Sequence, residues 1–344
     1  NSVSFYSSND TNQELAIVGD TLFLDIESNE PLLDINIYIS EEGDVYNPAD
    51  TIINDISNDH LYKSWRILNG NEEEGYINFK INGTDLSGNI GDTISITTDG
   101  SSILYDRTPP IDFIIENLLT NNGNQVEGYW NSTNENLIFS IPIPDDNTLL
   151  DGGGIQIQAS FLDSNYLDLG EIYYIQEDAL SDIKTMIIHK EYFQNLEGFD
   201  DDINVNFRAK MWDKAGNFTY SSENNDQLHI DIIDPTIEPV NIYSNNILDT
   251  NWAKAFDSLF IDFSSSEILL NSRVLINNSL LNIVNTSDLN WEFSNIISDD
   301  FMEGQVNFKI YYEDIAGNIG DTISQTSNGS FVNIDNSEPI ISTL

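Results

Sequence analysis

Three aspartates in this sequence precede the same Gly-Asn pair, and a carboxylate at that position can do two kinds of chemistry. Asp85 begins DLSGN, Asp213 begins DKAGN and Asp314 begins DIAGN. An aspartate before such a turn can accept hydrogen bonds from the backbone N–H groups of the turn. With other oxygen ligands nearby, the same carboxylate can bind a hard cation such as Ca²⁺. Both interpretations remain open at this level.

Residues for other chemistry are scarce. The three histidines, His60, His189 and His229, show no metal-ligand spacing, and the absence of cysteine excludes disulfides and thiolate sites. No nucleophile, zincin, Walker or dinucleotide motif occurs. Paired carboxylates can hydrolyse glycosides, but 58 acidic residues make close pairs inevitable. We therefore expect no enzymatic activity.

Composition narrows the partners. The 344 residues are 40% hydrophobic, enough for folded cores, and carry a formal net charge of -46. Such a field repels nucleic acids and anionic membranes and attracts cations. No apolar run has the length of a membrane span, so we expect no direct membrane insertion. The first residues lack a signal-peptide pattern, and we expect a mature protein or a fragment of a longer one.

Internal repeats define the organisation. Residues 74–95 and 303–324 are identical at 15 of 22 positions, and VNFRAKMWDKAGNF lies between them as a third copy. A second phrase recurs as DRTPP from Asp106, DPTIEP from Asp234 and DNSEP from Asp335. Each follows a strand-like run and ends in proline, which stops strand pairing. We predict modules at 1–109, 110–238 and 239–338, with 339–344 as a tail or the start of another module.

Within each module the text alternates apolar and polar residues, as half-buried strands do. The stretch closest to helical periodicity is DALSDIKTMI in the middle module. We expect Trp65 and Trp291 to anchor cores. Strands in the first module are predicted at 3–7, 20–27, 33–39, 61–68, 75–82, 92–98 and 102–106. This density of short strands predicts an all-β tandem array of three immunoglobulin-like sandwiches.

The chain resembles the bacterial immunoglobulin-like repeats of large cell-surface adhesins and stalk proteins, which include cadherin-like calcium-dependent arrays. The resemblance rests on GDT, a strand ending in SxEP, an EG-x-V-x-F strand, D-x-A-G-N and a closing D-x-x-x-P. It covers essentially the whole chain, with a longer and divergent middle module. It implies stalk, spacer or adhesive units outside the cell, frequently with calcium where modules meet.

In a sandwich of this kind, acidic loops of neighbouring modules converge where the modules meet. Clustered carboxylates repel one another, so they are separated as solvated turn caps or held by a cation. We predict calcium, with Mg²⁺ a poor substitute. The first joint is expected to gather acids from 72–74, the linker, and Asp145, Asp146 and Asp213 of the next module. The second joint is expected to gather acids from 200–202, the linker and the next module. The predicted ligands are Glu74, Asp106, Asp145 and Asp213 at the first joint, and Asp202, Asp234, Glu267 and Asp314 at the second.

These features predict a non-enzymatic, extracellular or cell-surface array that acts as a rod-like stalk or spacer. Its partners would be neighbouring modules of the same polypeptide and, in addition, a surface glycan or protein ligand. Two alternatives remain: a carbohydrate- or protein-binding module, or the accessory region of a large secreted hydrolase. The middle module has extra residues around 160–200, with Tyr166, Tyr173 and Tyr174 close together. This surplus either adds strand and a short helix or forms a binding site.

Overall fold

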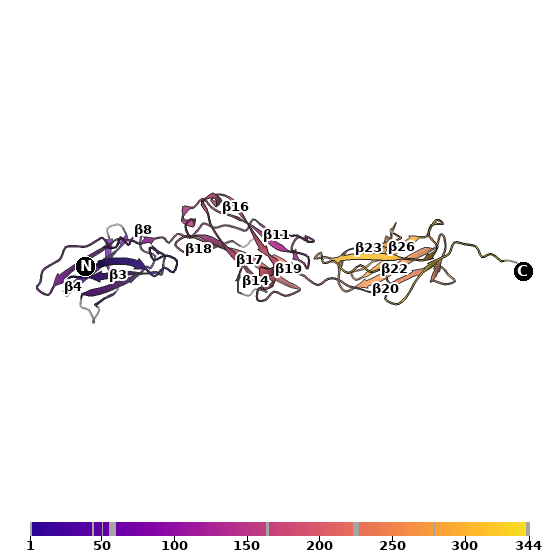
Figure 1. Cartoon of the computed structure of the whole chain (residues 1–344), viewed down its shortest axis with the longest axis horizontal. Helices are drawn as coiled ribbons and strands as arrows, with labels where there is room; N and C mark the ends of the chain where they lie inside the picture. Colours follow the sequence, from indigo (N-terminus) through magenta and orange to yellow (C-terminus); the bar gives the residue numbers. More distant parts are fainter. Residues whose placement is uncertain are drawn as a thin grey trace.

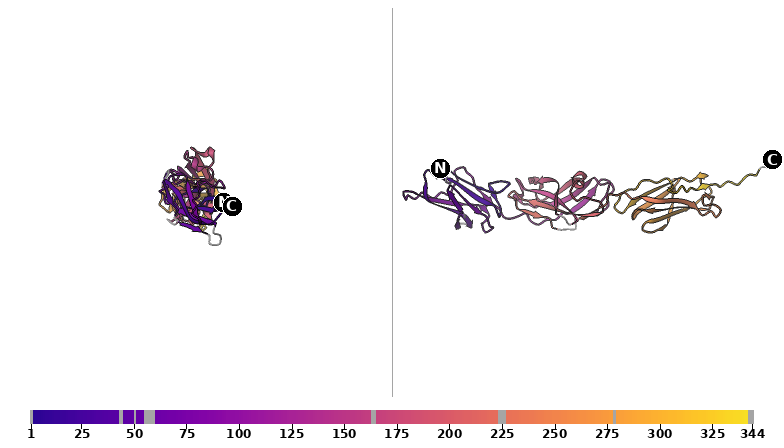
Figure 2. Two further views of the ribbon diagram at one scale, coloured as in Figure 1. Left: turned by 90° about the vertical axis from the view of Figure 1, so that its left-hand side faces the viewer. Right: turned by 90° about the horizontal axis from the view of Figure 1, so that it is seen from below.

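The structure is a computed structural model that describes residues 2–42, 45–49, 51–54, 60–162, 165–222, 227–277 and 279–341. It is all-β and consists of immunoglobulin-like β-sandwiches in tandem, as predicted. Three sandwiches follow one another along one long axis (Figures 1 and 2). We call them the first, second and third modules. No helix among the described residues is long and apolar enough to cross a membrane.

Alternating sequence produces the strands. In β3 (Thr21–Glu27) and β22 (Ser258–Ser265), every second side chain is buried and its neighbours are partly exposed. Such alternation places one face of a sheet on a core and the other face toward water. These two strands come from the GDT phrases at equivalent places in the first and third modules.

The first and third modules have the same arrangement of three sheets. A short parallel pair near the C-terminal end of each module, β2 with β10 and β21 with β29, joins the beginning of the module to its end. In the first module the sheets are β1 (Ser2–Ser7), β3, β7 (Leu61–Ile67), β6 (Thr51–Asn54); β5 (Val45–Pro48), β4 (Leu32–Glu42), β9 (Phe79–Asp85); and β2 (Leu15–Ala16), β10 (Leu104–Tyr105), β8 (Gly75–Tyr76). In the third they are β20 (Ile237–Ser244), β22, β26 (Asn290–Ile296), β25 (Asn282–Thr286); β24 (Ser279–Leu280), β23 (Leu269–Ile276), β28 (Phe308–Asp314); and β21 (Trp252–Ala253), β29 (Asn333–Ile334), β27 (Gly304–Gln305).

The second module is larger and has one sheet of six strands. Between residues 160 and 200 its described residues form β15 (Leu167–Tyr174), β16 (Ile183–His189) and the short helix α1 (Lys190–Gln194). The six-stranded sheet contains β12 (Tyr129–Trp130), β19 (Gln227–Ile230), β17 (Ile203–Trp212), β14 (Gly154–Phe161), β15 (Leu167–Tyr174) and β18 (Phe218–Tyr220). The other elements are β11 (Asn117–Asn121), β13 (Asn136–Pro142), β16 (Ile183–His189), α1 (Lys190–Gln194), and the 3-10 helices η1 (Asn147–Leu149) and η2 (Glu177–Ala179).

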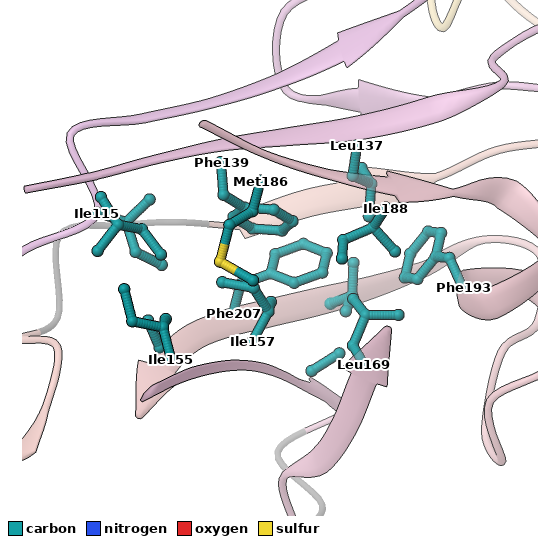
Figure 3. Packing of buried hydrophobic residues seen from close by; sticks show 14 of the residues in the cluster. Ile115, Leu137, Phe139, Ile155, Ile157, Leu169, Met186, Ile188, Phe193 and Phe207 are labelled. Atoms are coloured by element: carbon teal, nitrogen blue, oxygen red, sulfur yellow. The ribbon is translucent and has the colours of Figure 1, made fainter. Parts of the chain in front are cut away.

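Each module has a hydrophobic core of its own. The buried clusters draw on residues 3–105, 113–230 and 237–334, and no cluster combines two of these ranges. In the second module, Phe139 from β13 and Phe207 from β17 meet edge to face between the two sheets, with ring centroids 5.3 Å apart (Figure 3). Interdigitation of this kind gives each sandwich its own stability.

Local predictions failed where tertiary contacts decide the structure. Residues 92–98 form only an isolated bridge, Ile81 with Ile94, and not the predicted strand. DALSDIKTMI, the stretch closest to helical periodicity, contains the end of a 3-10 helix and the first residues of β16. Trp65 is only partly buried, Trp291 is partly buried and packs against the core of the third module, and the fully buried tryptophan is Trp130. The third core begins at Ile237, before the predicted start of that module at residue 239.

Candidate functional site at the joints between modules

Each module ends with the same backbone hydrogen bond, which defines where the linker begins. The donor is the first linker aspartate and the acceptor is a carbonyl in the short parallel pair: Asp106 to Ala16 (3.0 Å), Asp231 to Trp130 (2.9 Å) and Asp335 to Ala253 (3.0 Å). Asp231 is therefore the structural equivalent of Asp106, and Asp234 is not. We call residues 106–110 the first joint and residues 231–235 the second; Pro110, Pro235 and Pro339 end the three D-x-x-x-P segments.

A second repeated contact involves an acidic residue in a loop of the module that precedes each linker. The residue after the linker aspartate donates its backbone N–H to that acid: Arg107 to Glu74 (3.0 Å), Ile232 to Asp201 (2.8 Å) and Asn336 to Glu303 (3.0 Å). Glu74 therefore lies at the first joint, the position predicted for it. At the second joint the corresponding acid is Asp201, whereas Asp202 is exposed and lies 3.3 Å from Nε2 of His229.

The three Gly-Asn turns, residues 85–89, 213–217 and 314–318, share a capping geometry. One carboxylate oxygen of Asp213 accepts from the backbone N–H groups of Ala215 (2.9 Å), Gly216 (2.8 Å) and Asn217 (3.0 Å), and the other accepts from the amide of Asn217 at 3.0 Å. Asp85 and Asp314 likewise bond both the backbone and the side chain of their asparagine. The aspartates are turn caps in all three modules.

The second and third of these turns also hold the modules together. The amide of Asn217 donates to the carbonyl of Asp106 (3.1 Å), and the amide of Asn318 donates to the carbonyl of Asp231 (3.0 Å). Side-chain amides of the preceding module donate to backbone carbonyls of these turns. The bonds run from Asn9 to Ala215 (2.9 Å), from Asn124 to Gly317 (2.9 Å) and from Asn131 to Ala316 (2.7 Å). Each Gly-Asn turn at a joint is therefore hydrogen-bonded both to the linker and to the preceding module.

Burial follows from this interlocking. Ala215 and Ala316 are both 0% exposed, and Asn131 is buried with them. The first module has Ser87 at the equivalent position, where it is exposed to solvent. Two turns with nearly the same sequence thus differ in burial because only one of them contacts a preceding module.

The first joint combines carboxylates with a lysine. Burial raises the pKa of Asp106, and the charges of Glu74 and Asp146 raise it further, while Lys214 opposes them. Burial also raises the pKa of Asp213, with a contribution from Asp106. Hydrogen bonds from Thr108 lower the pKa of Glu74.

Two acids expected at the first joint have other surroundings. Asp145 is exposed, and it is its neighbour Asp146 whose charge reaches the linker. Glu72 is buried inside the first module, 3.4 Å from the guanidinium of Arg66. The structure thus brings Glu74, Asp106 and Asp213 toward one joint, with Asp146 in place of Asp145.

The second joint is a cluster of three acids. Asp231, Glu267 and Asp314 each place a carboxylate oxygen within 4.8 Å of the others, the one such group among the described residues. Burial, followed by the charges of Asp314, Asp231 and Asp201, raises the pKa of Glu267 to about 7. Burial and the charge of Asp314 also raise the pKa of Asp231. Where the first joint has Lys214 in its turn, the second has Ile315.

The predicted ligands Glu267 and Asp314 therefore meet, while Asp234 and Asp202 stand outside the cluster. Asp234 accepts a hydrogen bond of 2.9 Å from Ser132 of the second module. The acid that the prediction missed, Asp231, begins a D-x-x-x-P segment, a spacing visible in the sequence. The asparagines that donate hydrogen bonds to the turns are not marked by any sequence motif, because Asn is common throughout this chain.

No protein family model matches the sequence, and no curated protein matches it. The chain is similar to a solved structure of a 1.5-MDa bacterial ice-binding adhesin, with 11% identity, 97% of this chain and 98% of the other covered, and a TM-score of 0.35. It is also similar to the N-terminal eight Ig domains of Down Syndrome Cell Adhesion Molecule, with 10% identity, 94% and 42% coverage, and a TM-score of 0.32.

A third similar structure is a tetra-tandem repeat in the extending region of a large adhesion protein, with 11% identity, 98% and 74% coverage, and a TM-score of 0.28. The second of these structures consists of Ig domains and the third of a tandem repeat. The assignment of this chain to tandem immunoglobulin-like sandwiches rests on its own sheets and cores.

Proposed function

We propose that this chain is a non-enzymatic, extracellular or cell-surface spacer that holds what lies at its two ends apart at a fixed distance. The observation that carries the proposal is the interlocking of each Gly-Asn turn with the linker and the module above. Modules joined by a flexible linker would not share buried residues such as Ala215 and Ala316. The end-to-end arrangement in Figure 2 is what a spacer needs.

Calcium at the second joint is part of the proposal. The donor set of Asp231, Glu267 and Asp314 is made of carboxylates alone, which suits a hard cation. Three acids this close repel one another unless a proton or a cation compensates them. A bound ion would connect the linker acid Asp231 to two loops of the third module, so its binding energy would stabilise the stacking of modules.

The first joint differs in charge compensation. Lys214 already offsets the negative charge around Asp106, so the demand for a cation is smaller there. We propose that the second joint binds calcium more tightly than the first. Extracellular calcium modules commonly bind with a Kd of about 10⁻⁴ to 10⁻³ M, and this range is expected here.

The decisive experiment measures length and calcium together. Small-angle scattering of the full chain should give a rod-like profile, and chelation should increase bending at the second joint more than at the first. Isothermal titration with calcium should give one site of higher affinity, with Mg²⁺ a poor substitute. A compact profile would refute the spacer. A rod that is indifferent to calcium would leave the spacer intact and refute the metal.

Glycan binding by the second module receives less support. The ring of Tyr166 is covered by the guanidinium of Arg208 at 3.9 Å, and the ring of Tyr173 by the ammonium of Lys184 at 3.7 Å. Cation–π contacts of this kind occupy one face of each ring with the chain's own charges. The surplus residues of this module are thus better explained as structure than as a sugar platform.

A further inference from the structure

The first module has a cavity at its N-terminal end, the end that corresponds to the linker-facing end of the third module. Its volume is about 340 Å³, and it lies between the two sheets near the Gly-Asn turn of residues 85–89. Apolar side chains contribute to its walls, among them Leu32, Ile35, Ile90 and Ile94. Ile90 is 81% exposed and Ile94 is 43% exposed, so apolar surface is accessible there.

Comparison with the other modules explains the cavity. The residue at the start of this space is Gly83, and its equivalents are Met211 in the second module and Tyr312 in the third. Strand pairing supports the correspondence, because Ile35 faces Gly83 in the first module as Ser272 faces Tyr312 in the third. Met211 and Tyr312 are both buried. The first module therefore lacks a large side chain that the other two bury.

The third module shows what fits this space. Its Tyr312 ring lies against Gly320 so closely that a Cβ on Gly320 would come within 2.1 Å of the ring. The equivalent glycine in the first module, Gly91, has only the carbonyl of Gly83 nearby, at 3.6 Å. Ile35 does not compensate, since it remains only partly buried. The first module therefore has no ring beside Gly91, although a Cβ on Gly83 would lie 3.0 Å from the side chain of Leu32 and 3.2 Å from the carbonyl oxygen of Asp34.

Charge around the cavity selects among aromatic ligands. Four acids line it, Glu27, Glu30, Asp85 and Asp92, and no lysine or arginine does among the residues that the structure describes. Hydrogen bonds from Asn89 lower the pKa of Asp85, so this carboxylate stays ionised at neutral pH. An apolar wall with an acidic rim favours a ring that carries or adjoins a positive charge.

We propose that this cavity binds an aromatic side chain flanked by basic residues on a partner protein, with the ring in the place that Tyr312 takes in the third module. A linker of the D-x-x-x-P type is the competing occupant, because Pro235 of the second joint packs beside Gly320 in the third module. Such a linker would bring an acid toward the acidic rim, as Asp231 does toward Glu267 and Asp314 at the second joint, and would leave the space of the missing ring unfilled. The inference is independent of calcium at the joints.

The test uses small probes on the full chain, followed by NMR shifts of the isoleucine methyl groups. Tyramine, p-cresol and 4-hydroxyphenylacetate share a phenol ring and differ in charge. Tyramine should bind best and the anion worst, by about tenfold or more between these two. Equal shifts for all three, or none for tyramine, would overturn the proposal.

Variants separate the cavity from its rim. Ile35→Ser with Gly83→Tyr transfers the Ser272–Tyr312 pair of the third module, where Leu269 and Tyr312 belong to the same buried core, and should abolish binding. Leu86→Tyr adds a tyrosine at the same exposed end as a control and should leave binding unchanged. Should the double variant fail to fold, Glu30→Gln with Asp92→Asn should weaken tyramine while sparing p-cresol.

Peptides then distinguish the occupants. A Lys-Tyr-Lys peptide should compete with tyramine, whereas a Glu-Tyr-Glu peptide should not. The chain's own segment DNSEPII serves as the linker probe. Competition by DNSEPII and not by the basic peptide would replace the proposal with a seat for another linker.

Discussion

The side-chain amide of Asn9 donates a hydrogen bond of 2.9 Å to the backbone carbonyl of Ala215, 206 residues further along the chain. The same amide group donates to Asp20 at 3.1 Å within its own module. One asparagine therefore ties the loop between β1 and β2 of the first module to the Gly-Asn turn of the second module. The equivalent asparagine of the third module is Asn246, which accepts a hydrogen bond from the backbone N–H of Leu248 in its own module and lies at the far end of the array.

This equivalence gives a matched pair of variants. Asn9→Ala removes the bond to Ala215 and leaves that buried carbonyl without its partner, which costs about 1 to 3 kcal/mol. Asn246→Ala removes only local bonds and should cost less. Hydrogen exchange should accelerate in residues 213–217 for Asn9→Ala and stay unchanged for Asn246→Ala. Equal exchange in both variants would show that the joint does not depend on this contact.

Size at the Gly-Asn turn is a second test of the joint. Ala316 is fully buried between the modules, whereas Ser87 at the equivalent position is exposed. Ala316→Leu should wedge the second joint open, with a loss of about 1 to 3 kcal/mol and a more bent scattering profile. Ser87→Leu should change stability by less than about 0.5 kcal/mol. The turn would not be an element of the joint if the two variants behaved alike.

The architecture was predictable from the sequence because period-2 alternation and the near-identical phrases at 74–95 and 303–324 are local signals. The candidate site was predictable only in part. The resemblance between DPTIEP and DRTPP suggested Asp234 as the linker acid, yet the hydrogen bond to Trp130 assigns that place to Asp231. Strand pairing fixes this register, and a constant offset along the chain does not, because the second module has a loop of different length before its linker.

Contacts between modules were the least predictable. Glu267 and Asp314 were expected to converge, and they do, since both lie on loops at the same end of one sandwich. The hydrogen bond from Asn131 to the carbonyl of Ala316 depends on how two sandwiches are stacked, which no local sequence pattern encodes. The cavity at Gly83 was likewise invisible until the strands of two modules were compared residue by residue.

Calcium binding should separate the two linker aspartates of the second joint. Asp231→Asn removes a charge from the cluster and should weaken calcium binding by about tenfold or more, because ligand charge sets affinity at such sites. Asp234→Asn changes only the bond with Ser132 and should alter affinity by less than about threefold. Calorimetric titration of both variants measures the difference. The reverse order of effects would restore Asp234 as the ligand.

The raised pKa of Glu267 predicts how stability depends on pH in calcium-free protein. Its carboxyl titrates near 4.5 when unfolded and at about 7 in the folded chain. Between these values the folded state binds more protons than the unfolded state, so stability falls as pH rises through this window. Burial shifts Asp231 in the same direction, whereas the lowered pKa of Glu74 acts only at lower pH.

Calcium should reverse this dependence, since the ion competes with the proton for Glu267 and binds better as pH rises toward about 7. Denaturant midpoints of the third module, measured with chelator and with excess calcium, should therefore diverge as pH increases. Glu267→Gln cannot release a proton at this position, so its chelator curve should be flatter than that of the unmodified chain. Stability in chelator is compared as a function of pH for the unmodified chain and for Glu267→Gln. If the two slopes are the same, Glu267 does not titrate under the influence of its acidic neighbours, and the argument for a cation among these acids is wrong.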